Sequence, residues 1–501
     1  MAEQARQRQR KRPNGSASGL TARIGILGSG FSGLGMAIRL KLDGCEDFVV
    51  LEKAADLGGT WRENTYPGAA CDVPSHLYCY SFEPNPDWSR LFAPQAEILA
   101  YLRRCADKYD VRRFIQFQTE VVSARFDDAA RLWEVRTRDG RVMHFQILVA
   151  GKGALHVPSV PKLDGAERFR GPAFHSAQWD HSVDLTGKRV AVIGSGASAI
   201  QVVPSIAPRV ARLDYYQRTP PWVLPRGDRD YSRLEKQLFR ALPFAGWLHR
   251  QRIYWTLEPR VLAFTVDPRI MSLAARLGRR NIARHVADRE LRSKLTPRYT
   301  MGCKRTLISD DYYQALVRPN VEVVTDGIAE IRESGIVTKD GRVRDVDVLV
   351  YCTGFKVSEL LSGMDIRGAA GRSLADDWSE GARSFYGITV SGYPNLFFLM
   401  GPNTGLGHNS MIYMIESQIH YVLGAIRSLD ERGAATADVR PDVQERFSER
   451  LHRRLDRSVW ASGCQSWYLD EQGRNSTTWP GFTFEYRART RRFDPAHYQL
   501  A

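Results

Sequence analysis

Two glycine-rich segments, 166 residues apart, have the residue types and spacing that bind the pyrophosphate of a dinucleotide. Residues 28–33 read GSGFSG, and residues 194–199 read GSGASA, with alanine in the third glycine position. In this motif the first glycine makes a tight turn, the second lets the backbone approach the pyrophosphate, and the third packs a helix against a strand. The N-terminus of that helix then faces the phosphates with free N–H groups. The predicted contacts are Gly28, Gly30, Phe31, Ser32 and Gly33 in the first segment and Gly194, Ser195, Gly196, Ser198 and Ala199 in the second.

The residues that follow the second strand of each unit indicate which dinucleotide is bound. Glu52 lies nineteen positions after Gly33, close to the roughly 20 expected for a carboxylate that accepts hydrogen bonds from ribose hydroxyls. The second unit has Gln217, Arg218 and Thr219 at this place instead of an acid. Because a guanidinium binds phosphate bidentately, Arg218 favours a 2′-phosphate, and the alternative is a solvated loop residue. The pair of sites therefore indicates FAD in the first unit and NADPH in the second.

Short apolar runs supply the elements that position these motifs. The predicted strands are residues 23–27, 48–51, 115–121, 133–137, 145–150, 188–193, 213–216 and 346–351. Residues 222–300 are rich in Leu, Arg and Trp at helical spacing. The predicted fold class is α/β, with two Rossmann-like dinucleotide-binding domains and a helical insertion in the second. The predicted limits are a disordered basic tail over 1–20, an FAD-binding domain over 21–155 and 356–501, an NADP-binding domain over 156–221 and 301–355, and the insertion over 222–300.

Composition places the chain among globular proteins. Of 501 residues, 43% are hydrophobic and 25% charged, which excludes a disordered, collagen-like or coiled-coil chain, and no apolar run approaches the ~20 residues of a membrane-spanning helix. The net charge of +15 suits polyanionic dinucleotides, although nucleic-acid binding by the basic tail is an alternative to a solvated extension.

The seven cysteines are too few and too scattered for a disulfide framework, and they include no C-x-x-C pair. This pattern argues against a dithiol redox site and against a structural zinc site, so we expect no metal. An odd number of cysteines suits a reducing, cytoplasmic compartment. We also expect no nucleic-acid partner and no integral membrane segment, and the oligomeric state stays open.

Three further segments resemble the flavin-dependent Baeyer–Villiger monooxygenases. Residues 58–72 (GGTWRENTYPGAACD) match that family's GG-x-W-x4-[FY]-P-[GM]-x3-D motif at every fixed position. Residues 169–180 (FRGPAFHSAQWD) match F-x-G-x3-H-x3-W-[PD] in the same way. Residues 302–305 (GCKR) are similar to the segment that carries the family's active-site arginine. The resemblance extends from about residue 22 to residue 490 and omits only the tail.

The resemblance implies an NADPH- and O2-dependent enzyme that inserts one oxygen next to a ketone carbonyl, through a flavin C4a-peroxide, and releases an ester or lactone. Such a reaction needs an ionised peroxide and then develops a second oxyanion on the tetrahedral adduct. A guanidinium stabilises both anions and does not lose its proton. Arg305 is therefore the expected catalytic residue, and Asp72 is expected to pair with it and hold it in place.

The resemblance also assigns roles to residues around the two cofactors. Lys304 is expected to join Arg218 and Thr219 around the 2′-phosphate, and His175 and Trp179 to couple domain movement to NADPH binding. The other residues expected to bind cofactor are Lys53, Gly59, Thr60, Trp61, Asp72, Tyr78 and Val121.

The nearest alternative is an S- or N-oxygenating flavin monooxygenase, which uses the neutral hydroperoxide and needs no such arginine. A non-catalytic NADP(H) sensor is the other class, and the joint presence of Arg305 and Asp72 argues against it. The lack of a cysteine pair, a G-x-S-x-G elbow and an H-E-x-x-H motif disfavours a disulfide reductase, a serine hydrolase and a metal site.

Two places depart from the best-known ketone-oxidising members, namely residues 401–410 (GPNTGLGHNS) and Lys152. The departure at residues 401–410 leaves the range of ketone substrates open. The Leu- and Trp-rich insertion favours a bulky apolar ketone. For residues 238–248, contact with a membrane surface is the alternative to packing over the active site.

Overall fold

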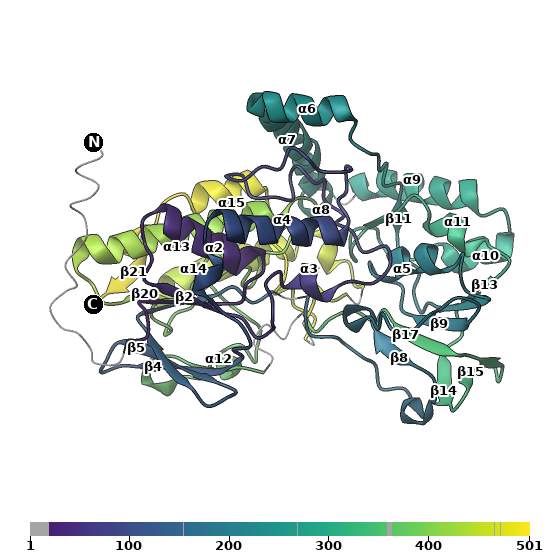
Figure 1. Ribbon diagram of the computed structural model, residues 1–501, viewed down its shortest axis with the longest axis horizontal. Coiled ribbons are helices and arrows are strands. Elements are labelled where there is room, and N and C mark those ends of the chain that lie inside the picture. The colour runs from purple at the N-terminus through teal and green to yellow at the C-terminus, as the bar shows by residue number, and fades with distance from the viewer. Residues whose placement is uncertain (1–19, 154, 268, 358–362, 465, 471) are drawn as a thin grey trace.

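The chain folds around two five-stranded parallel sheets, which lie to the left and right of Figure 1. The computed structural model describes residues 20–153, 155–267, 269–357, 363–464, 466–470 and 472–501. The basic tail expected over residues 1–20 lies outside these ranges apart from Leu20.

The first sheet has the strand order β19-β7-β1-β2-β3, and all its neighbouring strands are parallel. Its strands are β1 (Ile24–Leu27), β2 (Phe48–Leu51), β3 (Ile115–Gln116), β7 (Ile147–Ala150) and β19 (Leu396–Phe398). Because β19 comes much later in the chain than the other four strands, the chain returns to complete the first sheet, as the sequence predicts. Helices α2 (Phe31–Leu42), α4 (Gln95–Lys108) and α13 (Met411–Arg432) share a hydrophobic core with one face of this sheet.

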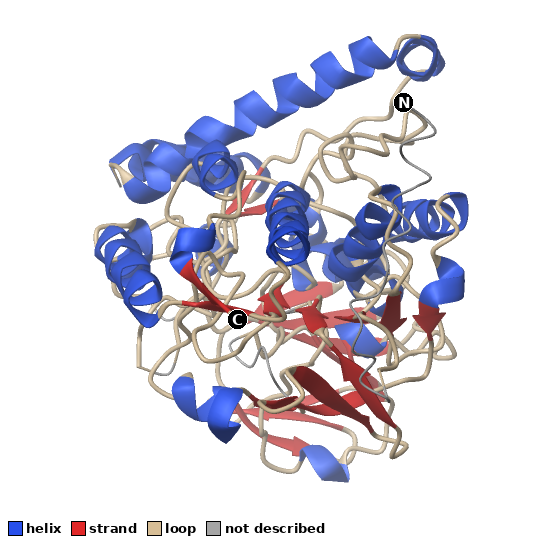
Figure 2. Cartoon of the chain, turned by 90° about the vertical axis from the view of Figure 1, so that its left-hand side faces the viewer, coloured by secondary structure: helices blue, strands red, loops and turns tan. Residues whose placement is uncertain are grey.

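The opposite face packs on a four-stranded sheet in the order β18-β4-β5-β6, and most red strands of Figure 2 lie in the lower half of the molecule. Its strands are β4 (Val121–Asp127), β5 (Leu132–Thr137), β6 (Val142–Phe145) and β18 (Asp365–Arg367). Two strand predictions are wrong here. Residues 115–121 are not one strand, because Gln118 has a φ of 52° and separates β3 from β4. Residues 145–150 are divided between β6 and β7, since the chain passes there from one sheet to the other.

The second sheet has the order β13-β10-β9-β17-β8 and is also parallel throughout. Its strands are β8 (Ala173–His175), β9 (Arg189–Ile193), β10 (Arg212–Tyr216), β13 (Val321–Val324) and β17 (Val348–Tyr351). Helices α5 (Ala199–Ile206) and α11 (Tyr312–Leu316) pack on one face. The antiparallel strands β14 (Ile328–Arg332), β15 (Gly335–Thr338) and β16 (Val343–Asp345) form a small sheet, and β14 and β15 pack on the other face. The two Rossmann-like units of the prediction are thus present.

The insertion predicted over residues 222–300 is mainly helical. Its helices are α6 (Arg233–Ala241), α7 (Pro243–Leu257), α8 (Val261–Thr265), α9 (Arg269–His285) and α10 (Arg289–Leu295). Its first residues form β11 (Val223–Leu224), which pairs in parallel with β12 (Leu307–Ile308) just after the insertion. In Figure 1, α6 and α7 lie at the top of the molecule, and α9 and α10 lie on the right, near the second sheet.

The chain crosses between the two units at two neighbouring segments. The N–H of Ser159 donates to the carbonyl oxygen of Gly354 at 2.9 Å, and the hydroxyl of Thr353 donates to that of Ser159 at 2.6 Å. The two crossings therefore lie side by side. The domain limits drawn from the sequence stay predictions.

The remaining elements complete the C-terminal part and the connections. They are α3 (Thr60–Glu63), α12 (Leu374–Asp377), α14 (Pro441–Leu455), α15 (Thr483–Arg489), β20 (Ala437–Val439), β21 (Tyr498–Leu500), and the 3-10 helices η1 (Arg112–Phe114), η2 (Ala166–Arg168), η3 (Ser176–Gln178), η4 (Glu258–Arg260), η5 (Ala369–Gly371), η6 (Val459–Ala461) and η7 (Pro495–His497). Within the described residues, no helix combines the length and the apolar character needed to cross a membrane.

Candidate functional site

The first glycine-rich turn joins β1 to α2 and leaves its backbone open on one side. Gly28 has a φ of 90°, and a Cβ on Gly33 would lie 1.8 Å from the carbonyl oxygen of Gly28, so both glycines are required by the turn itself. Gly30 faces Gly59, where a Cβ would lie 3.1 Å from the Cα of Gly30. This glycine-lined cradle, which any side chain would fill, fits a dinucleotide pyrophosphate.

Glu52 lies at the end of β2, as predicted, and is almost fully buried. Its carboxylate accepts hydrogen bonds from the N–H and the hydroxyl of Ser29, at 2.9 and 2.7 Å, and from Arg62 at 3.2 Å. The acid therefore braces the glycine turn. Ser29 was not among the predicted contacts, although its place between two fingerprint glycines is a usable signal. Lys53 is exposed beside this acid, and Val121 begins β4.

Three aromatic side chains from separate segments form a wall beside the first turn. The ring of Tyr78 lies 5.2 Å from that of Phe31 and 5.6 Å from that of Trp61, both edge to face. The indole N–H of Trp61 donates to the hydroxyl of Tyr78 at 3.2 Å. Thr60 begins α3 immediately before Trp61. An aromatic wall next to a pyrophosphate cradle fits the isoalloxazine ring of a flavin dinucleotide.

The segment from residue 58 to residue 72 leaves this wall and packs on α5 of the second unit. The hydroxyl of Tyr66 donates to Gln201 at 2.9 Å, and the side-chain amide of Gln201 donates to the carbonyl oxygen of Ala70 at 3.0 Å. Gly68 has a φ of 83°, and a Cβ there would lie 2.2 Å from the hydroxyl oxygen of Ser205. The segment thus spans both units and places Asp72 between them.

Asp72 and Arg305, which are 233 residues apart, form the ion pair that the sequence predicts. The guanidinium donates to one carboxylate oxygen from Nη2 at 2.6 Å and from Nε at 3.2 Å. Burial by itself would raise the pKa of Asp72, but the charge and hydrogen bonds of Arg305 hold that pKa below its ordinary value. The ion pair therefore persists as pH falls to the ordinary range of an aspartate and breaks only below it.

The guanidinium of Arg305 is held in its charged state next to the aromatic wall. Asp72 raises the pKa of Arg305 above its ordinary value, which outweighs the opposite effect of burial. The charges of both residues also act on the hydroxyl of Tyr78. About a third of each side chain of the pair stays accessible (34% for Arg305 and 30% for Asp72), so the cation can still meet a ligand.

Two further side chains at this pair were missed by sequence reasoning. The hydroxyl of Tyr468 is buried without a hydrogen-bond partner among the described residues, and the nearby charge of Arg305 lowers a pKa that burial raises. Arg226 donates to the carbonyl oxygen of Cys71 at 2.7 Å and so braces the residue before Asp72. Nothing in the local sequence marks either residue, because each comes from a segment more than 70 residues away from its partner.

Cys303, two residues before Arg305, forms a disulfide with Cys464 across 161 residues of sequence. The sequence predicts no disulfide framework, and this single bond is a departure from the reduced cysteines it suggests. The cysteines Cys45, Cys71, Cys79, Cys105 and Cys352 are free. The bond joins the loop of Arg305 to the segment that carries Tyr468.

Replacement of Cys464 by serine is expected to lower the free energy of unfolding by about 2–4 kcal/mol, because the bond closes a long loop in the unfolded chain. The measurement is the thermal unfolding midpoint under oxidising conditions, with Cys45→Ser as the control at a free, half-exposed thiol. An equal shift in both variants would show that the bond contributes nothing specific.

The second glycine-rich turn joins β9 to α5 and is also open. A Cβ on Gly194 would lie 2.3 Å from the carbonyl oxygen of Cys352, whereas a Cβ on Gly196 would meet no described atom within 4 Å. The hydroxyl of Ser195 donates to the carbonyl oxygen of Thr219 at 2.7 Å and ties the turn to the end of β10. Ser198 and Ala199 begin the helix behind it.

Arg218 and Lys304 lie close enough to repel one another next to this turn. Burial, followed by the charge of Arg218, lowers the pKa of Lys304. Within the described residues neither cation has a carboxylate partner, and a side-chain oxygen of buried Gln217 has no donor. Two uncompensated cations beside an open glycine turn fit a 2′-phosphorylated dinucleotide.

His175 lies beside one of the crossings, and Trp179 packs against the core of the second sheet. His175 ends β8 opposite Tyr351, and its ring lies 5.7 Å from that of Phe355. Burial lowers the pKa of His175. The ring of Trp179 packs edge to face on Phe174 at 5.0 Å. The contact of His175 with Phe355 at one crossing agrees with the expected coupling, which stays a prediction.

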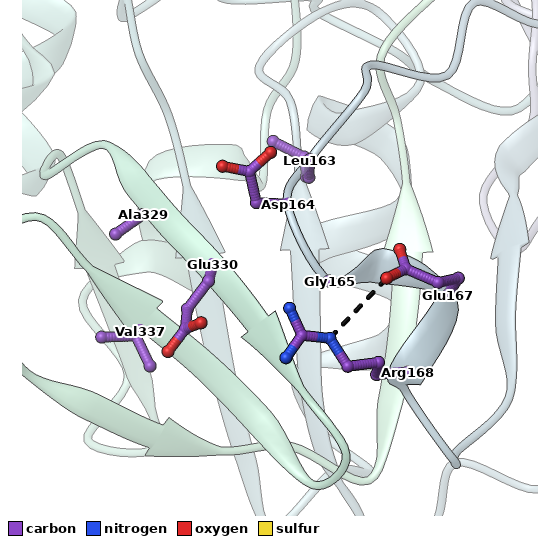
Figure 3. A pocket seen from close by; sticks show the side chains of 8 residues that line it. All are labelled: Leu163, Asp164, Gly165, Glu167, Arg168, Ala329, Glu330 and Val337. Carbon is purple, nitrogen blue, oxygen red and sulfur yellow. Dashed lines mark ion pairs between the residues drawn. The ribbon is translucent and has the colours of Figure 1, made fainter.

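A surface hollow of about 630 Å³ lies away from all these groups, between η2 and the β14-β15 hairpin (Figure 3). Its charged side chains are Asp164, Glu167, Arg168 and Glu330, and Arg168 pairs with Glu167 at 3.6 Å. None of the predicted site residues lines it.

Comparison with known proteins agrees with this geometry. The family model for flavin-binding monooxygenase-like proteins matches residues 21–361. A Baeyer–Villiger monooxygenase of Pseudomonas aeruginosa is 52% identical over 480 residues, which cover 95% of this chain and 91% of that protein. The solved structure of an oxidized steroid monooxygenase bound to NADP is 31% identical with a TM-score of 0.87, covering 96% of this chain and 99% of that chain. OTEMO in complex with FAD and NADP is 28% identical with a TM-score of 0.86, covering 96% and 100%. The chain therefore belongs to the flavin-binding monooxygenase-like family and, within it, to the Baeyer–Villiger monooxygenases.

Proposed function

We propose that the protein uses NADPH, FAD and O2 to convert a ketone into an ester or lactone. The observation that carries this proposal is the Arg305–Asp72 ion pair, which lies beside the aromatic wall of the first unit and next to Lys304 of the second. The two glycine turns support the cofactors: the cradle of Gly28 and Gly30 suits FAD, and the turn of Gly196 with Arg218 and Lys304 suits NADPH.

FAD, when bound, supplies hydride acceptance from NADPH and activation of O2. The chain's own residues then stabilise the negative charge that develops on the substrate. Arg305 stabilises the oxyanion that develops on the carbonyl oxygen of the ketone, and its raised pKa keeps it from losing its proton to that anion. Asp72 orients the guanidinium and holds it beside the aromatic wall. The aromatic wall excludes water from the reacting atoms.

We further propose that the ketone is bulky and apolar. Phe264 and Met271 of the insertion lie against Gly302, in the loop of Arg305. Phe264 also lies against Gly407, within residues 401–410 that depart from the best-known members. The insertion therefore packs buried apolar side chains against the catalytic loop.

The test of the function supplies NADPH and ¹⁸O-labelled O2 to the purified protein with a panel of ketones, thioethers and amines. We expect one labelled oxygen in an ester or lactone, detected by mass spectrometry. Label in a sulfoxide or N-oxide alone would assign the S- or N-oxygenating chemistry instead. Oxidation of NADPH with no oxygenated product would indicate a protein that only binds and oxidises the nucleotide.

Tyr468→Phe is expected to reduce ester formation about tenfold while NADPH oxidation continues at an unchanged rate. The charge of Arg305 acts on this hydroxyl, so we assign Tyr468 to the positioning of the guanidinium and not to contact with the substrate. The measurement is the ratio of ester formed to NADPH consumed. A matched loss of both rates, or a change confined to the ketone KM, would contradict the assignment.

The cytoplasmic location stays a prediction. The disulfide between Cys303 and Cys464 argues against it, because such bonds are rare in reducing compartments.

A further inference from the structure

Helices α6 and α7 form an arm that projects from the insertion. In Figures 1 and 2 a helical pair lies at the upper edge of the molecule, above the sheets. Only Leu242 separates the two helices, and Phe239 of α6 packs beside Gly246 of α7. The capping box of Ser232 and Glu235 fixes the start of α6. The arm is therefore an ordered structure and not a frayed loop.

The arm exposes several large apolar side chains. Leu234 and Leu238 are one helical turn apart and are 76% and 47% exposed, and Phe244 and Trp247 stack on one another at 5.5 Å while 67% and 52% exposed. Among the described residues, twelve of the twenty-one strongly exposed large apolar side chains belong to the insertion, so this exposure is concentrated and not scattered. We call the following set the arm face: Leu234, Leu238, Leu242, Phe244, Trp247 and Leu248.

The same arm carries positive charge that the protein does not neutralise. Residues 233–252 contain five lysines and arginines and one acid, Glu235, which is already bound by Arg229. Within the described part of the chain, Arg233, Lys236 and Arg252 have no carboxylate partner. The arm therefore combines exposed Leu, Phe and Trp with uncompensated cations.

We propose that the arm face docks on a lipid bilayer that contains anionic lipids. Helices with Leu, Phe and Trp on one side and Lys and Arg beside them lie in the membrane interface, held by apolar burial and by attraction to anionic headgroups. Charge also distinguishes this occupant from a second copy of the chain, because a symmetric dimer through this face would bring two cationic arms together. Docking of this kind needs no membrane-spanning helix.

The test is co-flotation of the purified full-length protein with vesicles of phosphatidylcholine, alone or mixed with phosphatidylglycerol. We expect binding to the mixed vesicles and little to phosphatidylcholine alone. Each basic residue near an anionic surface contributes about fivefold in affinity, so added salt and the variant R233Q/K236Q should both weaken binding.

The decisive variant is F244S/W247S, which we expect to lower vesicle affinity about tenfold or more. The matched controls are L42S and V343S, which change apolar side chains of similar exposure (53% and 52%) outside the insertion, and they should bind as the unsubstituted protein does. The thermal unfolding midpoint of each variant shows that the fold is intact. Since the basic tail is the same in every variant, it does not account for a difference between them.

Three results would overturn the proposal. The first is that the unsubstituted protein does not bind mixed vesicles at low salt, and the second is that F244S/W247S binds them equally well. The third is a dimer in analytical ultracentrifugation that F244S/W247S converts to monomer while vesicle binding is unchanged, which would assign the arm face to a second copy.

Discussion

Arg305→Ala is expected to abolish ester formation, with a loss of about 10²–10³-fold or more in its rate, while the protein still binds FAD and oxidises NADPH. Arg305 is the cation of the ion pair, and its removal leaves the oxyanion on the ketone without a fixed positive charge. Removal also leaves Asp72 without its main partner, and since burial raises the pKa of that carboxyl, it will take up a proton more readily.

The measurement for Arg305 separates two readouts, namely NADPH consumption by absorbance and ester yield by mass spectrometry. Arg305→Lys retains the charge but cannot make both hydrogen bonds to Asp72, so it should recover only part of the ester yield. Arg342→Ala is the control, because it removes an exposed surface ion pair with Glu322 and should change neither readout. Ester formation near the wild-type rate in Arg305→Ala would remove this arginine from the mechanism.

Arg218→Ala is expected to raise the KM for NADPH about 10- to 100-fold while the KM for NADH changes little. The two nucleotides differ only in the 2′-phosphate, which the guanidinium of Arg218 would bind together with Lys304. Burial, followed by the charge of Arg218, lowers the pKa of Lys304, and two neighbouring cations beside the open glycine turn suit an anionic group of the ligand.

Steady-state kinetics with both nucleotides, at one ketone concentration, tests the Arg218 prediction. Lys304→Ala should show the same preference in weaker form, because an ammonium does not bind phosphate bidentately. A similar rise in KM for NADH and NADPH would reject the contact with the 2′-phosphate and leave Arg218 as a general contributor to nucleotide binding.

The parts of the site that the sequence predicts best are those built within about thirty residues. In the first unit a strand, a glycine turn, a helix and an acid follow one another, and the structure places Gly28, Gly33 and Glu52 where the spacing requires. Each contact there joins neighbours along the chain, so residue type and spacing already specify it. The same holds for β1, β2, β9 and β10, whose apolar runs are predicted to within one residue.

Contacts between distant segments required the folded chain. Tyr468 lies near Arg305, and Cys303 pairs with Cys464 across 161 residues. No local sequence pattern predicts either of these contacts. Similarly, Gln118 has a positive φ that divides a predicted strand. This conformation is required where the chain passes from one sheet to another, and the local sequence does not predict it.

Asp72 and Arg305 show both cases at once. The family resemblance and the residue types identified both as site residues from the sequence. Only the packing of residues 66–70 on α5 explains how two groups 233 residues apart come within 2.6 Å. Local chemistry along the chain determined the two cofactor turns. Tertiary packing alone decided which side chains from distant segments meet beside these two turns. The free energy of those contacts depends on the whole fold and not on neighbours in sequence.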